Sequence, residues 1–177
     1  RMGRGKHYSW WRHYADKAEA VLFGESWAWS VAYSLGLQGR LRVDRHDFHI
    51  ARTNLTSELR VAFASDLHAG PLTDQRLFDH LADAINTFSP HVVLLGGDYI
   101  SSHHRHVENL RSFLDAISPT FGILAVFGNH DLWVDDQHIH AVMTDRGVRM
   151  LINEEHRLGE PFEDVSIFGL DEPGTGE

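Results

Sequence analysis

Three short polar motifs in this chain each follow an apolar run, and their side chains are of the kinds that bind metals. Asp66 and His68 flank a leucine after the first run, Asp98 follows two glycines after the second, and residues 128–131 (Gly-Asn-His-Asp) follow the third. If the apolar runs are neighbouring parallel strands, their carboxyl ends lie at one edge of the sheet, where ligands bind in open α/β folds. The motifs together predict a metal site with nitrogen and oxygen ligands.

Each motif taken singly has a simpler explanation. An aspartate such as Asp66 or Asp98 can hold the turn after a strand, and Asp-x-His tripeptides arise by chance in many proteins. Three such motifs in succession, each at the end of an apolar run, favour one shared site. In that site Asp98 could bridge two cations, Asn129 offers a neutral oxygen, and His130 can titrate near neutral pH.

The segments between the motifs predict the elements that position them. Helical spacing of apolar residues occupies each interval between strands, and Thr73 is the predicted cap of the first helix. The alternation of strand and helix (βαβαβαβ) predicts an α/β fold with a parallel sheet and crossover helices. The predicted strands are residues 59–64, 91–95, 122–127 and 148–152, followed by a hairpin of residues 156–158 and 165–168.

Composition excludes several classes of site and partner. The chain has 177 residues, of which 42% are apolar, and this suits a single globular domain with an appendage. The absence of cysteine excludes disulfides, thiolate zinc sites and cysteine nucleophiles. Residues 1–52 carry a net charge of +4 and the remainder −13, which indicates two parts with different partners. The acidic part argues against a nucleic-acid-binding groove.

We expect two parts in the chain, an aromatic and basic helical leader at residues 1–39 and the motif-bearing domain at residues 40–177. Residues 7–37 contain four of the five tryptophans. The longest uncharged run of the leader, residues 26–39, is shorter than the roughly 20 residues that span a bilayer, and no signal peptide is evident. Two alternatives stay open for the leader, a helix lying in a membrane interface or a helix packed on the domain.

The three motifs resemble those of the calcineurin-like metallophosphoesterases, in which Asp-x-His, Gly-Asp and Gly-Asn-His-(Asp/Glu) each follow a parallel strand. The resemblance runs from about residue 60 to the end of the chain. It implies a two-sheet sandwich flanked by helices, and a centre of two divalent metal ions (Mn, Fe, Zn or Mg). It also implies that Asp66 and His68 hold the first metal, that Asp98 bridges both, and that Asn129 holds the second.

The same resemblance implies roles for the next two residues. His130 would face the phosphate and stabilise or protonate the leaving oxygen, while Asp131 would either orient His130 or hold the local turn. The implied reaction is hydrolysis of a phosphomonoester, phosphodiester or pyrophosphate bond by a hydroxide that two metals generate, without a covalent enzyme intermediate. Two rivals are a non-catalytic scaffold of this fold that binds proteins, and an unrelated α/β hydrolase with one metal. The intact motif residues argue against both.

The sequence departs from the family pattern in two places. The family's later histidines, a lone His and then Gly-His-x-His, do not occur after Asp131. We therefore expect a domain truncated before its second sheet is complete, with a partial metal centre that is inactive alone. Asp98 is followed by Tyr-Ile-Ser-Ser rather than the Val-Asp-Arg-Gly of protein Ser/Thr phosphatases, which argues against a protein phosphatase.

Residues 66–71, 93–99 and 169–172 look more like those of a bacterial branch of this family that is often found at membranes. That branch includes enzymes that act on phospholipids or a lipid A precursor. The likeness implies a phosphoester small-molecule, nucleotide-sugar or lipid substrate, peripheral membrane contact through residues 7–37, and a location in the cytoplasm or at the inner membrane. Trp133 is predicted either to line the pocket rim or simply to pack. The other histidines are predicted to be solvated or at the surface, and the alternative for the first three is contact with substrate phosphates when protonated; they are His103, His104, His106, His138, His140 and His156.

Overall fold

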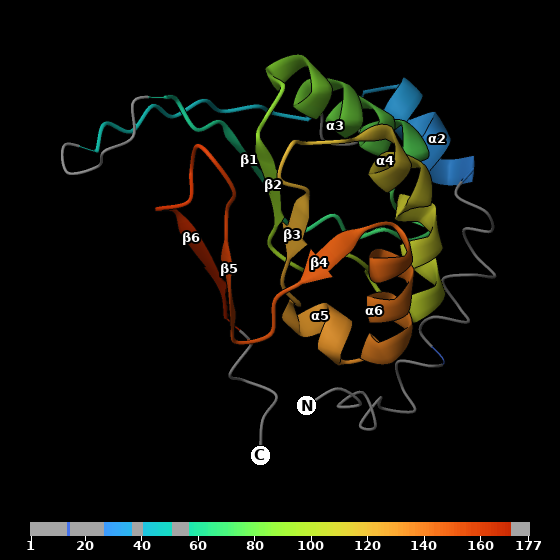
Figure 1. The fold of residues 1–177 in the computed structure, drawn as a ribbon. Coiled ribbons are helices and arrows are strands. Elements are labelled where there is room, and N and C mark those ends of the chain that lie inside the picture. Colours follow the sequence, from blue (N-terminus) through green and yellow to red (C-terminus); the bar gives the residue numbers. More distant parts are fainter. Residues whose placement is uncertain (1–13, 15–26, 37–40, 51–56, 171–177) are drawn as a thin grey trace.

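A four-stranded parallel sheet lies at the centre of the computed structural model, which describes residues 14, 27–36, 41–50 and 57–170 (Figure 1). Its strands lie side by side in sequence order. In the register, Ala64 pairs with Leu95 and Leu95 with Ala125, so the three motif-bearing loops leave the sheet at one level. The strands are β1 (Val61–Ala64), β2 (Val92–Leu95), β3 (Ile123–Ala125) and β4 (Val148–Met150).

The helices of the domain gather on one side of this sheet (Figure 1). Alternate sheet residues such as Val93, Leu95 and Ile123 join the helices in one apolar core, because successive side chains of a strand point to opposite faces. The predicted parallel α/β fold is therefore confirmed. The helices are α3 (Gln75–Phe88), the 3-10 helix η2 (His104–Leu110), α4 (Arg111–Ala116), α5 (Asn129–Leu132) and α6 (Asp136–Asp145).

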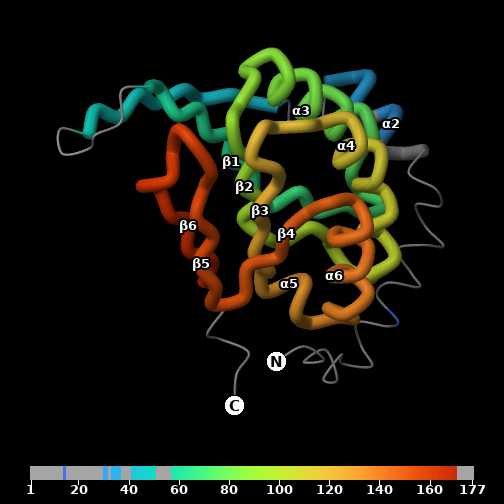
Figure 2. Tube along the Cα trace, viewed as in Figure 1, coloured from blue at the N-terminus to red at the C-terminus, as the bar shows by residue number. Residues whose placement is uncertain are grey.

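A hairpin stands on the other side of the sheet (Figure 2). Its strands, β5 (Glu154–Arg157) and β6 (Ser166–Gly169), are antiparallel, which confirms the predicted hairpin with slightly shifted ends. A second apolar cluster fills the space behind it, with Val92 and Leu124 from the sheet and Leu158 and Phe162 from the hairpin loop. The sheet is thus covered on both faces, as parallel sheets usually are.

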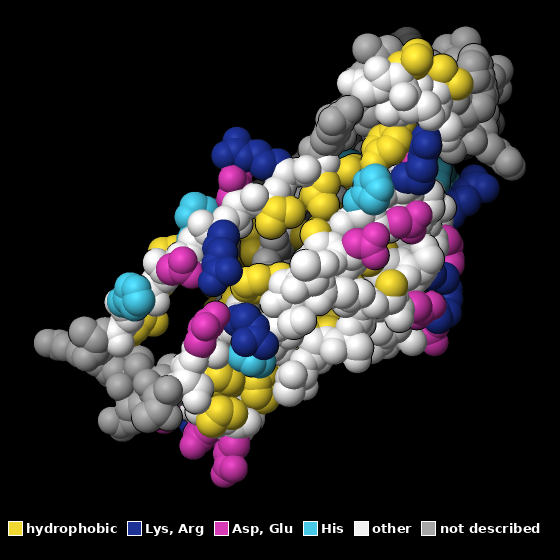
Figure 3. Space-filling model, turned by 90° about the horizontal axis from the view of Figure 1, so that it is seen from above, with side chains coloured by type: hydrophobic (Ala, Val, Ile, Leu, Met, Phe, Trp, Pro, Cys, Tyr) yellow, Lys and Arg dark blue, Asp and Glu magenta, His cyan; other side chains and the backbone are white. Residues whose placement is uncertain are grey.

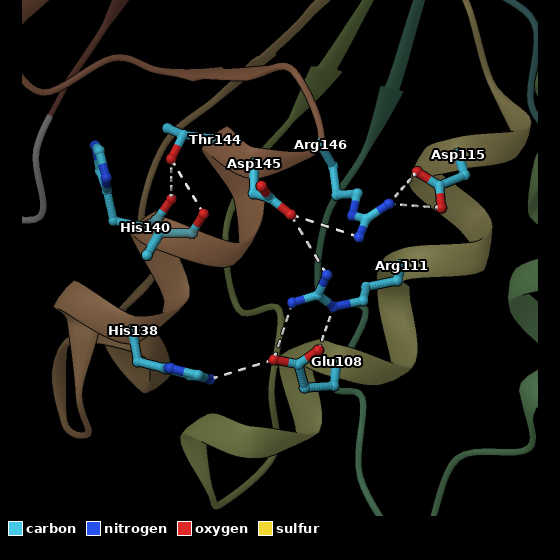
Figure 4. Close-up of polar contacts among 9 residues, drawn as sticks. Glu108, Arg111, Asp115, His138, His140, Thr144, Asp145 and Arg146 are labelled. Carbon is cyan, nitrogen blue, oxygen red and sulfur yellow. Dashed lines mark hydrogen bonds and ion pairs between the residues drawn. The ribbon is translucent and has the colours of Figure 1, made fainter.

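A network of ion pairs joins α6 to the helices beside it (Figure 4). Arg111 pairs with Glu108 of η2 and lies 3.4 Å from Asp145 of α6. Arg146, at the end of α6, lies 3.0 Å from Asp115 of α4 and 3.4 Å from Asp145. Single exposed ion pairs contribute little, but a connected set fixes the geometry between elements. The network holds α6 where it follows the third motif.

The first helix starts one residue later than predicted, and part of the second helix is of the 3-10 type. The cap of α3 is Asp74, whose carboxylate accepts the backbone N–H of Arg76, while the Thr73 hydroxyl donates to the carbonyl of His68 at 2.7 Å. The second helix begins as the 3-10 helix η2 before it continues as α4. Both deviations occur beside the motif loops, where contacts with other loops outweigh local helix preference.

The described part of the leader is α2 (Trp27–Ser34), and it packs on α3. The Tyr33 hydroxyl lies 2.6 Å from Nδ1 of His80, and the Arg76 guanidinium lies 4.5 Å above the Tyr33 ring and donates to the carbonyl of Ser30. These contacts pack one side of this helix on the domain, while Val31 and Leu35 stay exposed. The leader helix predicted around Trp11 lies, apart from Tyr14, outside the described residues.

The surface seen from above carries charged and histidine side chains with hydrophobic ones between them (Figure 3). None of the helices in the described segments is long and apolar enough to cross a membrane. Large apolar side chains that are exposed include Val31 and Leu35 near α2, Phe63 on β1 and Phe168 on β6.

Candidate metal centre

The loops after β1 and β2 run side by side beyond the ends of their strands. The backbone N–H of Asp66 donates to the carbonyl of Gly97 at 3.0 Å, and that of His68 donates to the carbonyl of Asp98 at 2.9 Å. The two loops are thus joined by backbone hydrogen bonds, as the strands before them are. The first and second motifs therefore face each other at the carboxyl edge of the sheet.

Three predicted ligands have a backbone conformation that residues with side chains rarely adopt. The φ angles of Asp66, His68 and Asp98 are 57°, 43° and 54°, all in the left-handed region. This conformation costs an L-residue about 1–2 kcal/mol. Such strain persists only where surrounding contacts hold it, and it clusters at functional sites. Its coincidence with the predicted ligands supports a functional role for the motif loops.

The same three residues form a group that could hold a metal ion, and we call them the ligand group. Ligand atoms of Asp66, His68 and Asp98 lie within 4.8 Å of one another, and Nε2 of His68 lies 3.8 Å from Oδ1 of Asp66. Asp66 is exposed and the other two are half-buried, so the group is open to solvent on one side. Two carboxylates and an imidazole suit divalent Mn, Fe, Zn or Mg. The donor set therefore fits the divalent metals that the sequence predicts.

Two glycines allow the second and third motifs to touch. Gly97 has a φ of 91°, and a Cβ there would lie 2.3 Å from the backbone nitrogen of Gly128. A Cβ on Gly128 would lie 2.2 Å from Oδ1 of Asp98. Asn129 follows directly as the first residue of α5 and is half-buried. Asn129, the fourth predicted ligand, is therefore the next residue after the glycine that lies against the Asp98 carboxylate. Coordination of a metal by Asn129 stays a prediction.

Asp131 is fully buried and ties the second and third motifs together. Its carboxylate accepts backbone N–H groups from Asp98 and Tyr99 at 2.9 Å and from Gly128 at 3.0 Å. Burial raises the pKa of Asp131 to about 7, although these three donors favour the ionised form. Of the two expected roles, these are the contacts of a residue that holds the turn.

His130 lies beside the ligand group. Its backbone N–H donates to Oδ1 of Asp98 at 2.9 Å, and its ring lies edge-on to the His68 ring with the centroids 4.9 Å apart. Nδ1 of His130 is 3.2 Å from the carbonyl oxygen of Ser101. A half-buried imidazole next to the ligands is placed to exchange a proton with a molecule bound there.

The other histidines are half-buried rather than fully solvated. His104 and His138 face each other from η2 and α6 with ring centroids 5.1 Å apart, and Nε2 of His138 lies 3.6 Å from the Glu108 carboxylate. Burial lowers the pKa of both His104 and His106. The helical spacing of Val107 and Leu110 gave no sign of this packing. The half-buried histidines are His103, His104, His106, His138, His140 and His156.

Three residues that support the motif loops could not be identified from sequence. The hydroxyls of Ser101 and Thr73 both donate to the carbonyl of His68 at 2.7 Å, and this helps to hold the left-handed conformation of that residue. The buried Tyr99 hydroxyl donates to the carbonyl of Val126 at 2.6 Å. In the sequence, the one feature that could have pointed to these three residues is their position close to a motif.

Comparison with known proteins agrees with this geometry. An uncharacterised metallophosphoesterase of Campylobacter jejuni is 26% identical over 117 residues, which cover 66% of this chain and 31% of the relative. The phosphodiesterase YaeI of Escherichia coli is 26% identical over 78% of this chain and 53% of its own length. A zebrafish (Danio rerio) transmembrane protein with a metallophosphoesterase domain is 25% identical over 64% of this chain and 27% of its own length.

The match with the family itself covers most of the described domain. This chain spans between 28% and 44% of the length of the first three curated relatives. No solved structure matches it significantly. The model of the calcineurin-like phosphoesterase family matches residues 59–172, which contain all three motifs. The chain therefore belongs to the calcineurin-like phosphoesterase family.

Proposed function

We propose that this chain carries the first metal ligands of a phosphoesterase with two divalent metal ions. The proposed reaction is hydrolysis of a phosphomonoester, phosphodiester or pyrophosphate bond. The observation that carries this proposal is the convergence of Asp66, His68 and Asp98 on strained, hydrogen-bonded loops. A non-catalytic scaffold would have no need to hold three metal-binding side chains at an energetic cost.

In the proposed centre, Asp66 and His68 hold one metal, Asp98 lies between the two, and Asn129 holds the second. Bound divalent metals supply an activated water nucleophile and neutralise charge on the phosphoryl oxygens. The chain's own part is to present oxygen and nitrogen ligands in a fixed arrangement. The hydrogen bonds between the loops provide that rigidity, since each ligand-bearing loop is bonded to the next.

His130 and Asp131 have different proposed tasks. His130 lies beside the ligand group and, in the form with a proton on both ring nitrogens, donates the Nε2 proton to the leaving oxygen, because its Nδ1–H is already directed at a carbonyl. Asp131 acts at a distance from the substrate by holding the backbone of both loops. The three backbone N–H groups that its carboxylate accepts, from Asp98, Tyr99 and Gly128, support this division.

The substrate and the leader are a related proposal. We propose a lipid-linked or nucleotide-sugar phosphoester, approached at a membrane surface through residues 7–37. The exposed Val31 and Leu35 support it, as does the similarity to relatives named transmembrane proteins. Sedimentation with anionic liposomes, with and without residues 1–39, tests it. Equal sedimentation of both forms would reject membrane contact.

The reaction is tested with the full-length protein and bis(p-nitrophenyl) phosphate in the presence of Mn²⁺. Turnover should be lost in Asp98→Asn. In His130→Ala it should fall about 100-fold or more while bound metal is retained. The exposed His49, replaced by alanine, is the matched control and should leave turnover unchanged. Loss of metal in His130→Ala would show that this residue is a ligand instead, and absence of any metal-dependent turnover would reject the proposed reaction.

A further inference from the structure

The His130 ring has a distinctive set of neighbours. Within the described residues, the contacts of its ring are to one carbonyl oxygen and two other rings, at Ser101, His68 and Trp133. The orientation of this imidazole therefore depends on a neutral acceptor and on packing, whereas catalytic histidines are often oriented by a carboxylate.

The carbonyl of Ser101 determines which nitrogen of His130 carries a proton. A carbonyl oxygen can only accept, so Nδ1 at 3.2 Å must donate, and Nε2 is left as the nitrogen that can exchange a proton with a ligand. The Ser101 backbone is itself held, since its N–H donates to the carbonyl of Ala69 at 3.1 Å and its hydroxyl donates to that of His68. The acceptor is therefore fixed relative to the first motif.

One hydrogen bond leaves the His130 ring free to turn about its side-chain torsions. A half-turn of the ring exchanges the positions of its two edges, and it would direct Nδ1 away from the Ser101 carbonyl. The edge-on His68 ring restrains one side, with the centroids 4.9 Å apart. A second restraint is needed on another side for the ring to have one orientation.

Trp133 supplies that restraint. Its ring centroid lies 4.6 Å from that of His130 with 46° between the planes, close enough for contact between ring atoms. The spacing of three residues places both side chains on one side of the α5 turn, and the N–H of Trp133 donates to the His130 carbonyl at 3.3 Å. Trp133 is half-buried, so its ring forms part of the wall beside the ligand group.

We infer that Trp133 is a positioning residue, which holds the His130 imidazole with Nδ1 on the Ser101 carbonyl and Nε2 toward the substrate. The inference builds on the proposed phosphoesterase reaction and goes beyond it, because it names what orients the proton donor. It requires the effect of Trp133 on turnover to pass through His130. A residue that merely packs would have an effect independent of His130.

The test is a double-mutant cycle in the full-length protein with Mn²⁺ and bis(p-nitrophenyl) phosphate. Trp133→Ala should lower kcat about 10- to 100-fold while KM and bound metal change little, since small misplacements of a reacting group have effects of this size. Trp133→Phe, which retains a flat ring, should stay within about threefold of the wild type. In the His130→Ala background, Trp133→Ala should change kcat less than about twofold.

A second readout needs no metal or substrate. In ¹⁵N NMR spectra of the metal-free protein at a pH where His130 is neutral, the wild type and Trp133→Phe should show a protonated Nδ1 and an unprotonated Nε2. Trp133→Ala should show averaged signals for the two nitrogens. Multiplicative losses of kcat in the double variant, or an unchanged tautomer in a folded Trp133→Ala protein, would overturn the inference. Failure of the wild type to hydrolyse the substrate would overturn the proposed function instead, and would leave the NMR prediction standing.

Discussion

Replacement of Asp131 by asparagine should loosen the junction between the second and third motifs. The carboxylate accepts two backbone N–H groups at Oδ2, from Asp98 and Gly128, and one at Oδ1, from Tyr99. Asparagine has nearly the same shape but a single oxygen. At least one buried N–H must therefore face an amide NH₂ group in the Asp131→Asn variant.

The size of the effect follows from the number of bonds lost. A hydrogen bond to a charged group contributes about 1.5–3 kcal/mol, and a buried donor without a partner costs about 1–3 kcal/mol. The least costly rotamer keeps the bonds to Asp98 and Gly128 and loses the one to Tyr99. We expect the free energy of unfolding to fall by about 2–4 kcal/mol. Mn²⁺ affinity should fall about tenfold or more, because the displaced loop carries Asp98.

Urea unfolding followed by tryptophan fluorescence, and calorimetric titration with Mn²⁺, measure the two quantities. The measurements belong at pH 8.5, above the Asp131 pKa of about 7. Asp135→Asn is the matched control, because this exposed carboxylate accepts one N–H, from His138 at the start of α6. Asparagine caps helices about as well as aspartate, so the control should lose less than about 0.5 kcal/mol. If Asp131→Asn matches this control in both measurements, the reasoning is refuted.

Three further predictions concern a close backbone approach, a helix cap and a buried hydroxyl. Gly97→Ala should lower the free energy of unfolding by about 3 kcal/mol or more, because its Cβ would meet the backbone of Gly128. Gly122→Ala, with positive φ but no atom within 4 Å, should cost only about 1 kcal/mol, and equal losses in urea unfolding would contradict this. Asp74→Asn should cost about 1–2 kcal/mol at pH 6. That cost should shrink as pH falls from about 4 toward 2, because hydrogen bonds from Arg76 lower the pKa of this carboxyl to about 2 and protonation removes their contribution, so a pH-independent cost would count against it. Tyr99→Phe should cost about 1–2 kcal/mol in thermal unfolding, since the half-buried Val126 carbonyl and the buried Leu95 carbonyl both lose this donor, and an unchanged Tm would argue against these bonds.

The positions of the motifs could be predicted because they depend on local sequence. An apolar run followed by glycine or aspartate marks the end of a strand, whatever the rest of the chain does. Ala64, Leu95 and Ala125 end their strands at one level, as the parallel-sheet prediction requires. The helix starts were less accurate, since Asp74 and not Thr73 caps α3, and both residues are plausible caps by type.

Contacts between distant loops could not be predicted. Nothing near Asp131 in the sequence distinguishes a carboxylate that orients His130 from one that accepts N–H groups 32 and 33 residues away. His104 and His138 lie in polar stretches, yet they become half-buried because η2 and α6 pack with these side chains facing each other. Burial of a polar residue depends on tertiary packing, and hydrophobic periodicity carries no information about that packing.

Manganese titration of the full-length protein and its Asp98→Asn variant tests the proposed two-metal centre most directly. Asp98 lies within ligand distance of Asp66 and His68 and against the start of α5, so both proposed metals depend on it. We predict two Mn²⁺ per wild-type chain and about tenfold or weaker binding at both sites in Asp98→Asn. Asp79→Asn, an exposed carboxylate on α3, should bind as the wild type does. Undiminished Mn²⁺ binding by a folded Asp98→Asn variant would contradict the proposed centre.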